Sequence, residues 1–260
     1  MPLQHIVEAQ QFDRDVMAQI FSVAREMEQV VKRYGSNILS RRVMATLFYE
    51  PSTRTRLSFE SAMLRLGGDV ITTESAQEFS SAAKGETLED TIRIIAGYAD
   101  VIVLRHFESG ASKRAAAVSP VPIISAGDGP GQHPTQALLD VYTIEREIGH
   151  LDGIRIAMVG DLANGRTVRS LCYLLAKYES PQIFFVAPEV VRMRDDIKEY
   201  LTRHQISWTE VSDLAQVAPQ VDVIYQTRIQ RERFGDRVGD YEQARGRFII
   251  DRGTLERMRD

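Results

Sequence analysis

Short apolar runs alternate with amphipathic segments along most of the chain. Runs rich in β-branched and aromatic residues predict buried strands at 43–49, 70–72, 101–104, 121–124, 154–159, 183–186, 221–225 and 248–250. Apolar residues at helical spacing predict helices over 57–66, 86–99, 111–118, 135–148, 167–178, 192–202 and from 253 onward. Because the strands are continuous apolar runs, we expect them to lie in parallel sheets with both faces covered.

The rhythm of strands and helices restarts near the middle of the chain. The helix over 135–148 leads into a polar, glycine-containing joint at 149–153, and a new strand follows it. Alternation on both sides of this joint predicts an α/β fold of two domains, each with a mostly parallel sheet flanked by helices. We expect the domains at 1–148 and 149–260, joined by an interdomain helix.

Composition narrows the class of protein. The chain has 260 residues and a net charge of −4, and 43% of its residues are hydrophobic, which is typical of a globular protein. Because it is mildly acidic and has no basic block, nucleic acid is not expected as a partner. The start at Met1 lacks the features of a signal peptide, and no apolar run is long enough to span a membrane. With a single cysteine, Cys172, these features predict a cytoplasmic protein that binds no membrane.

Polar side chains follow the predicted strands of the first half. Between the first strand and its helix stand Ser52, Thr53, Arg54 and Thr55. Backbone N–H groups at a helix start attract anions, and an arginine fork suits phosphate oxygens, so this run is a predicted anion site. The alternative is an ordinary helix cap beside solvated arginines. A further arginine, Arg105, comes directly after the strand at 101–104.

A glycine-rich segment, 127–136, brings His133 and Gln136 to the start of the next helix. Its Gln132 stands where the last glycine of a dinucleotide fingerprint should be, so nicotinamide binding is not expected. A histidine at a helix start can be kept neutral by the helix dipole and donate to a carbonyl oxygen.

Loops of the second half carry arginines that suit a carboxylate. The segment 160–167 nearly matches a phosphate-binding loop, but Arg166 replaces the required lysine and Asp161 lies where phosphates would crowd it. An arginine fork matches carboxylate geometry, so a carboxylate ligand is favoured. Arg228 and Gln230 follow the strand at 221–225 in the same way. For each loop, ordinary surface charge is the alternative.

A polar loop at 79–87 contains Ser80 and Lys84 and is either a closing loop or a solvated one. Taken with the arginines, it indicates an anionic substrate, because an acidic chain gathers cations at the ends of its sheets. The five histidines show no metal-ligand spacing, and Cys172 lies in an apolar helical stretch. No metal and no other cofactor is expected.

Two motifs of this chain resemble those of the carbamoyltransferase family. They are Ser52-Thr53-Arg54-Thr55-Arg56 and His133-Pro134-Thr135-Gln136. The resemblance extends through essentially the whole chain. The segments 160–168 and 227–230 resemble the aspartate branch, and the Ser-Met-Gly motif of the ornithine branch is not found. With the 79–87 loop, the sequence is most similar to the plant and cyanobacterial type of aspartate carbamoyltransferase.

The resemblance implies a reaction and a set of residues. The carbamoyl group of carbamoyl phosphate is transferred to the amine of L-aspartate, giving N-carbamoyl-L-aspartate and phosphate, in de novo pyrimidine biosynthesis. The first domain is implied to bind carbamoyl phosphate and the second aspartate. The residues implied to hold the phosphate are Ser52, Thr53, Arg54, Thr55 and Arg105. Those implied to face the carbamoyl group are Thr55, His133 and Gln136.

The remaining implied roles concern aspartate and the assembly. The residues implied to bind the aspartate carboxylates are Arg166, Arg228 and Gln230. Ser80 and Lys84 match residues delivered by a neighbouring subunit, which implies a homotrimer with shared active sites. The residues implied to be catalytic are Arg54, Thr55, Lys84, Arg105, His133 and Gln136.

Two alternatives remain beside this interpretation. An ornithine carbamoyltransferase is disfavoured because the cationic side chain of ornithine would meet Arg166 and Arg228. A non-catalytic anion-binding homologue is the second. By the family's pattern the chain is expected to be truncated, since it ends at Asp260 before the family's His-Pro-Leu-Pro-Arg loop and final helix.

Overall fold

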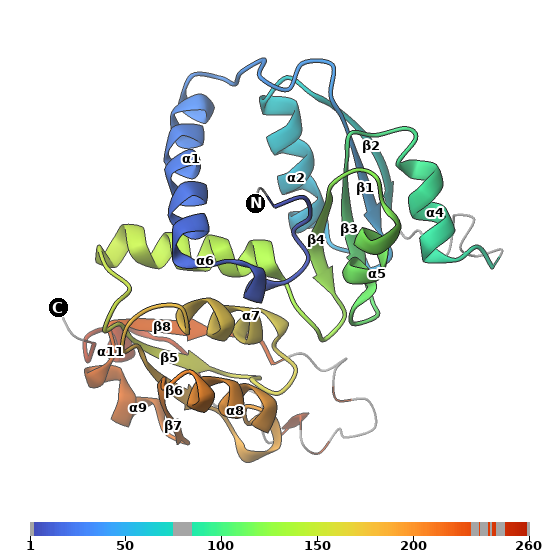
Figure 1. Ribbon diagram of the computed structural model, residues 1–260. Helices are drawn as coiled ribbons and strands as arrows, with labels where there is room; N and C mark the ends of the chain where they lie inside the picture. Colours follow the sequence, from blue (N-terminus) through green and yellow to red (C-terminus); the bar gives the residue numbers. More distant parts are fainter. Residues whose placement is uncertain are drawn as a thin grey trace. The chain divides into compact units, whose positions relative to one another are not determined.

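The computed structural model describes residues 3–74, 85–229, 234, 239, 241–242 and 248–258. The chain forms two compact units, Met1–Gln136 and Ala137–Asp260, which can be followed by colour in Figure 1. Each unit contains one four-stranded sheet whose strands are all parallel. The α/β class with two parallel, helix-flanked sheets, expected from the sequence, is confirmed.

The first unit has the strand order β2-β1-β3-β4. Its strands are β1 (Val43–Phe48), β2 (Asp69–Glu74), β3 (Val101–His106) and β4 (Ile123–Asp128). Its helices are η1 (Ala9–Gln11), α1 (Arg14–Lys32), α2 (Thr53–Arg65), α4 (Leu88–Ile95) and α5 (Ala111–Val118). The helix α6 (Pro134–Ile148) begins in this unit and continues into the second.

Both faces of the first sheet are covered by helices. Figure 1 shows α2 on one face and α4 with α5 on the other. On the α2 side, Met63 packs with Phe48 and Val103 in one core cluster. On the α4 side, Leu88 and Ile92 belong to a second cluster. Coverage of both faces explains why β1, β3 and β4 are almost continuously buried and read as apolar runs.

The second unit has the strand order β7-β6-β5-β8. Its strands are β5 (Arg155–Val159), β6 (Gln182–Val186), β7 (Ser207–Val211) and β8 (Val223–Gln226). Its helices are α7 (Arg166–Leu175), η3 (Glu189–Val191), α8 (Asp195–Arg203), α9 (Leu214–Val217), η4 (Ala218–Gln220) and α11 (Arg252–Leu255). The apolar residues that predict α7 are all fully buried, at Val168, Leu171, Leu174 and Leu175.

The structure corrects the predicted strand at 248–250, which is in neither a helix nor a strand. Phe248 and Ile250 do pack on the core that includes α9 and β5, so their apolar character is explained by burial alone. The carbonyl of Phe248 accepts a hydrogen bond from the side chain of Gln226, the last residue of β8. Among the helices of the described ranges, none is long and apolar enough to cross a bilayer.

Candidate active site

The candidate residues of the first unit follow three strands that are neighbours in the sheet. β1 pairs with β3, where Phe48 lies opposite Arg105, and β3 pairs with β4, where His106 lies opposite Asp128. Each of these strands leads into a segment that the sequence predicts to be part of a binding site. Because parallel strands end at the same edge of a sheet, the 52–55 turn, Arg105 and the 127–136 loop come together at this edge.

The 52–55 turn forms the start of helix α2. Ser52 is the N-cap residue, and its hydroxyl makes no capping hydrogen bond to the helix. Thr53 and Arg54 are exposed, and Thr55 is half-buried. The N–H groups of a first helical turn have no partner within the helix, so this turn offers backbone donors beside three hydroxyls and a guanidinium. The chemistry suits a phosphate group.

Arg56, the next residue of α2, is held in a network beneath this turn. Its Nη1 donates to Thr72 Oγ1 on β2 over 3.3 Å and lies 3.9 Å from Glu60 Oε1. Glu60 Oε1 accepts from Thr72 Oγ1 over 2.7 Å and from the buried Thr46 Oγ1 over 3.0 Å. The alternative of an ordinary helix cap beside solvated arginines does not describe Arg56, whose side chain is only 20% exposed. This network ties the start of α2 to β1 and β2.

Arg105 is fixed at the end of β3 by two neighbours. Its Nη1 donates to the carbonyl of Ala126 over 3.2 Å, and its Nη2 lies 3.2 Å from Glu50 Oε2. The side chain is 13% exposed, so the ion pair is shielded from water and strongly oriented. A guanidinium held in this way can present its remaining donors to a ligand with little loss of side-chain entropy.

The loop before α6 is built around the buried carboxylate of Asp128. Its oxygens accept from the N–H groups of Gly110 and Gln132 over 2.9 Å and 2.8 Å. The Gln132 side chain accepts from Ala9 N–H and donates to Gln10 Oε1, each over 2.7 Å. The non-glycine residue that argues against a dinucleotide fingerprint therefore ties the N-terminal segment to this loop.

His133 is the last residue before α6 and is 6% exposed. Its Nδ1 lies 3.4 Å from the hydroxyl of Thr135, which in turn lies 3.4 Å from the carbonyl of Ser125. Pro134 occupies the first helical position, where its fixed φ and missing N–H cost nothing. His133 and Gln136 are thus carried on the rigid first turn of α6, as the sequence predicts.

A second buried histidine, His106, lies beside Arg105 in the chain. Burial lowers the pKa of its ring, and its Nδ1 accepts from the N–H of Glu108 over 3.0 Å. The ring packs against Tyr49 and Phe107, with centroids 4.7 Å and 4.3 Å away. His106 is therefore a neutral packing residue that shapes the loop after β3.

The candidate residues of the second unit follow β5 and β8, which are also adjacent, with Val159 opposite Gln226. Arg166 is the first residue of α7 and is 7% exposed, whereas Arg228 is exposed two residues beyond β8. Thr227 lies between the two loops, with its N–H donating to the carbonyl of Val159 over 2.8 Å. The structure therefore brings the Arg166 and Arg228 segments to one edge of this sheet.

Asp161 explains why the 160–167 loop is not a phosphate loop. The carboxylate is buried and accepts from the backbone N–H and the side-chain amide of Asn164 over 3.0–3.1 Å. The position of this carboxylate inside the loop supports the prediction that the loop does not bind phosphate. The loop geometry leaves Arg166 as its cationic group at the helix start.

Three candidate residues, Ser80, Lys84 and Gln230, lie outside the described residues. Within the described ranges, no group of three or more histidine, cysteine or acidic side chains could hold a metal ion. Cys172 is fully buried, its Sγ lies 3.6 Å from Met158 Sδ, and burial strongly raises the pKa of its thiol. It is a packing residue, as the sequence predicts.

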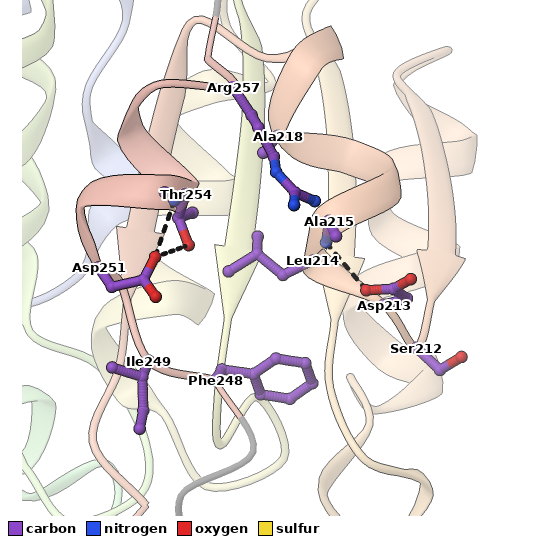
Figure 2. Close-up of a pocket in the computed structure, with 11 residues that line it drawn as sticks. Ser212, Asp213, Leu214, Ala215, Ala218, Phe248, Ile249, Asp251, Thr254 and Arg257 are labelled. Atoms are coloured by element: carbon purple, nitrogen blue, oxygen red, sulfur yellow. Dashed lines mark hydrogen bonds between the residues drawn. The ribbon is translucent and has the colours of Figure 1, made fainter.

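A hollow of about 450 Å³ lies in the second unit, lined by residues of α9, α11 and the segments beside them. Figure 2 shows the residues that line it. Asp213 and Asp251 cap the starts of these short helices by accepting from Ala215 and Thr254 N–H groups. Arg257 provides the cationic side chain of its lining. None of the residues expected to bind substrate lines this hollow.

Comparison with known proteins gives a consistent result for both halves of the chain. Residues 4–146 match the family described as aspartate/ornithine carbamoyltransferase, carbamoyl-P binding domain. Residues 152–260 match its Asp/Orn binding domain. Aspartate carbamoyltransferase 3, chloroplastic, of Pisum sativum is 67% identical over 98% of this chain and 66% of its own length. The chain thus spans about two thirds of the length of this plant relative.

Solved structures that are similar to this chain are named aspartate transcarbamoylase. The catalytic subunit of Methanocaldococcus jannaschii aspartate transcarbamoylase has a TM-score of 0.89 at 49% identity, covering 98% of this chain and 83% of that one. Aspartate transcarbamoylase from Trypanosoma cruzi in complex with N-(phosphonacetyl)-L-aspartic acid has a TM-score of 0.91 at 39% identity, covering 99% of this chain and 82% of that one.

These similarities also decide two expectations made from the sequence. The expectation of a cytoplasmic protein is wrong, because the plant relatives at 66–67% identity are all named chloroplastic, which points to a plastid. The names of the relatives support the aspartate branch over the ornithine alternative. The resemblance found in the motifs is confirmed, and the chain belongs to the aspartate/ornithine carbamoyltransferase family, within its aspartate carbamoyltransferase branch.

Proposed function

We propose that this chain transfers the carbamoyl group of carbamoyl phosphate to the amine of L-aspartate. The products are N-carbamoyl-L-aspartate and phosphate, in the direction of pyrimidine biosynthesis. The observation that carries the proposal is the 67% identity, over 98% of the chain, to a plant aspartate carbamoyltransferase. Substrate complexes of a Trypanosoma cruzi relative with carbamoyl phosphate and with aspartate support the same substrate pair.

The domain of residues 1–148 binds carbamoyl phosphate in this proposal. Ser52, Thr53, Arg54 and Thr55 hold the phosphate from the start of α2, and Arg105 contacts it from the end of β3. His133 and Gln136, on the first turn of α6, face the carbamoyl oxygen and nitrogen. Support comes from their position after three neighbouring strands, where open parallel sheets bind ligands.

The domain of residues 149–260 binds L-aspartate. Arg166, Arg228 and Gln230 pair with its carboxylates. The support is the position of Arg166 and Arg228 after the adjacent strands β5 and β8. Two cationic side chains match a dicarboxylic amino acid and disfavour ornithine, whose side chain is a cation.

The chemistry needs donors aimed at developing charge. The aspartate amine attacks the carbamoyl carbon, a C–N bond forms, and the bond from that carbon to the phosphate oxygen breaks. Negative charge grows on the carbamoyl oxygen and then on the phosphate, where Thr55, His133 and Arg54 act as donors. The departing phosphate accepts the amine proton, so no separate protein base is needed. No step calls for a metal or redox group.

The assembly in this proposal is a homotrimer in which Ser80 and Lys84 enter the site of a neighbouring subunit. Light scattering tests the assembly, since three chains per particle are expected. Mixing Lys84→Ala with Arg54→Ala chains tests the shared site. Hybrid trimers regain sites with both residues intact, so activity above either parent supports sharing, and none argues against it.

A colorimetric assay for carbamoylated product tests the function itself. We expect product from carbamoyl phosphate with aspartate and none with ornithine. Product with ornithine alone would assign the ornithine reaction instead. No product with either amine, despite binding of N-(phosphonacetyl)-L-aspartate, would make the chain a non-catalytic anion-binding homologue.

A further inference from the structure

The two arginine-bearing loops of the second unit come into close contact at Gly160 and Thr227. Gly160 directly follows β5 and has a φ of +113°, a conformation that favours glycine. A Cβ at this position would lie 2.5 Å from the carbonyl oxygen and 2.6 Å from the hydroxyl of Thr227. These two backbones can therefore meet only because residue 160 has no side chain.

Thr227 makes this approach from the other loop. Its hydroxyl lies 3.0 Å from the carbonyl of Val159 and 3.4 Å from that of Asp161, so one donor spans both sides of Gly160. Its own N–H donates to the Val159 carbonyl over 2.8 Å. The bonds of Thr227 thus continue the contact between β5 and β8 by one residue beyond their last pair, Val159 and Gln226. We call this set of contacts the Gly160–Thr227 clamp.

The clamp lies beside both predicted aspartate ligands. Thr227 is the neighbour of Arg228 in the chain. Gly160 opens the loop that ends at Arg166, and the tight packing of Gly165, whose Cβ would lie 2.8 Å from the Asp161 carbonyl, keeps that loop short and rigid. A change at the clamp therefore alters the contact between the two loops while leaving both arginines in the chain.

We infer that Thr227 is a positioning residue for aspartate, and that its hydroxyl sets the separation of Arg166 and Arg228 that a four-carbon dicarboxylic acid requires. The inference rests on the proposed function, in which those arginines bind the two carboxylates. Thr227 itself need not touch the substrate. Its role predicts a change in aspartate affinity with no change in carbamoyl phosphate binding, because the latter ligand is assigned to the first unit.

The test is steady-state kinetics on full-chain variants. Thr227→Val keeps the shape and removes the donor, and we expect the KM for aspartate to rise about tenfold, the effect of losing one partly buried hydrogen bond. The KM for carbamoyl phosphate and kcat should stay within about twofold of the parent. Thr227→Ser, which keeps the hydroxyl, should restore the aspartate KM. Thermal unfolding shows whether each variant is folded.

Thr143→Val is the matched control. Thr143 is an exposed residue of α6 whose hydroxyl donates to the Leu139 carbonyl over 2.8 Å, so it loses a hydroxyl-to-carbonyl bond that involves neither Gly160 nor Thr227. Its kinetic constants should not change. If Thr227→Val does not fold, Thr227→Ala removes the hydroxyl without a bulky replacement and carries the same expectation.

The outcomes separate this inference from the proposed function. If the parent chain makes no carbamoyl aspartate, the proposed function fails. If the parent is active and Thr227→Val has an unchanged aspartate KM, the inference alone is wrong. An equal rise in the KM of both substrates would also overturn it, because that result indicates general loosening of the chain.

Discussion

Both units place their candidate binding residues after adjacent parallel strands, but different interactions hold the two sets of loops. In the first unit the supports are side-chain hydrogen bonds that join separate elements, such as Glu60 of α2 with Thr46 of β1 and Gln132 with Ala9. In the second, two loops meet directly at Gly160 and Thr227, whose carbonyl and hydroxyl oxygens leave no room for a Cβ at residue 160.

The difference teaches where each region tolerates change. A side-chain network can lose one contact at a time, so the position of the 52–55 turn can be changed gradually by polar substitutions in the network beneath it. At Gly160 a carbonyl and a hydroxyl oxygen lie 2.5–2.6 Å from the position of a missing Cβ, so the contact between these loops should fail abruptly when a side chain is added there. The experiments below use this contrast.

The largest effect is expected from removing a donor in the first unit. Arg54→Met should lower kcat by about a hundredfold or more, because the guanidinium stabilises charge that develops on the departing phosphate. Arg228→Met, in the second unit, should mainly raise the KM for aspartate, since it pairs with a carboxylate that does not react. Steady-state assays with both substrates measure the split.

Arg93→Met is the control for this pair. Arg93 is an exposed residue of α4 that pairs with Asp90, so its loss changes charge without touching either loop. If Arg54→Met changes only the KM for carbamoyl phosphate and leaves kcat intact, the assignment of Arg54 to the departing phosphate is wrong.

The next effect concerns the backbone approach itself. Gly160→Ala introduces a Cβ into the Thr227 backbone at a positive φ, which should cost about 2–5 kcal/mol of unfolding free energy from strain and overpacking. Gly153→Ala is the control, because Gly153 also has a positive φ of +72° but no atom within 4 Å of its Cβ position. It should lose only about 1–2 kcal/mol. Urea unfolding compares them, and equal losses would remove the contact from the explanation.

The sequence predicts most of this fold because β1, β3, β4 and β5 are almost continuously buried apolar runs. Of the described elements that it does not predict, the two longest, α1 and β7, are mostly exposed or half-exposed to solvent. α1 has only Met17 and Phe21 fully buried over Arg14–Lys32, and β7 is an edge strand of half-exposed and exposed residues. The pattern of apolar residues predicts an element only where the element has a substantial buried face, so it does not predict elements that are mostly exposed to solvent.

The sequence also locates the candidate ligands but not their supports. A hydroxyl-rich turn or an arginine after a strand can be recognised locally, whereas Gln132 bonds to Ala9, 123 residues away, and Thr227 to Val159, 68 residues away. No local spacing relates such partners. The identity of the residues is therefore readable from the chain, and the interactions that orient them come only from the tertiary structure.

A smaller effect is expected from the network of the first unit. Glu60→Gln leaves a neutral acceptor for Thr46 and Thr72 but weakens the attraction to Arg56, so the start of α2 should loosen. We expect the KM for carbamoyl phosphate to rise about fivefold, with the aspartate KM unchanged. Glu26→Gln, at an exposed position of α1, is the control. A matching rise in the aspartate KM would mean that the two regions are not independently supported.

The smallest effect is expected from removing a side-chain ion pair on α7, the helix of the second unit that begins at Arg166. Arg169, one turn after Arg166 on α7, makes a two-pronged ion pair with Asp196 at the start of α8. The hydrogen bonds from Arg169 lower the pKa of Asp196 in the folded chain. A depressed carboxyl pKa stabilises the fold above the pKa of the unfolded state, and this contribution is lost as the pH falls through the folded pKa.

Asp196→Asn should therefore lower the unfolding free energy at neutral pH by no more than about 1 kcal/mol, because the carboxylate is more than half exposed to solvent. The deficit in unfolding free energy should shrink as the pH falls below about 4 and the Asp196 carboxyl of the parent becomes protonated, and so neutral like the asparagine. Glu199→Gln, an exposed carboxylate on the same helix, is the control for the loss of charge. Urea unfolding across this pH range measures both. A deficit that stays constant with pH would mean that Asp196 stabilises α8 by packing or capping and not through its charge.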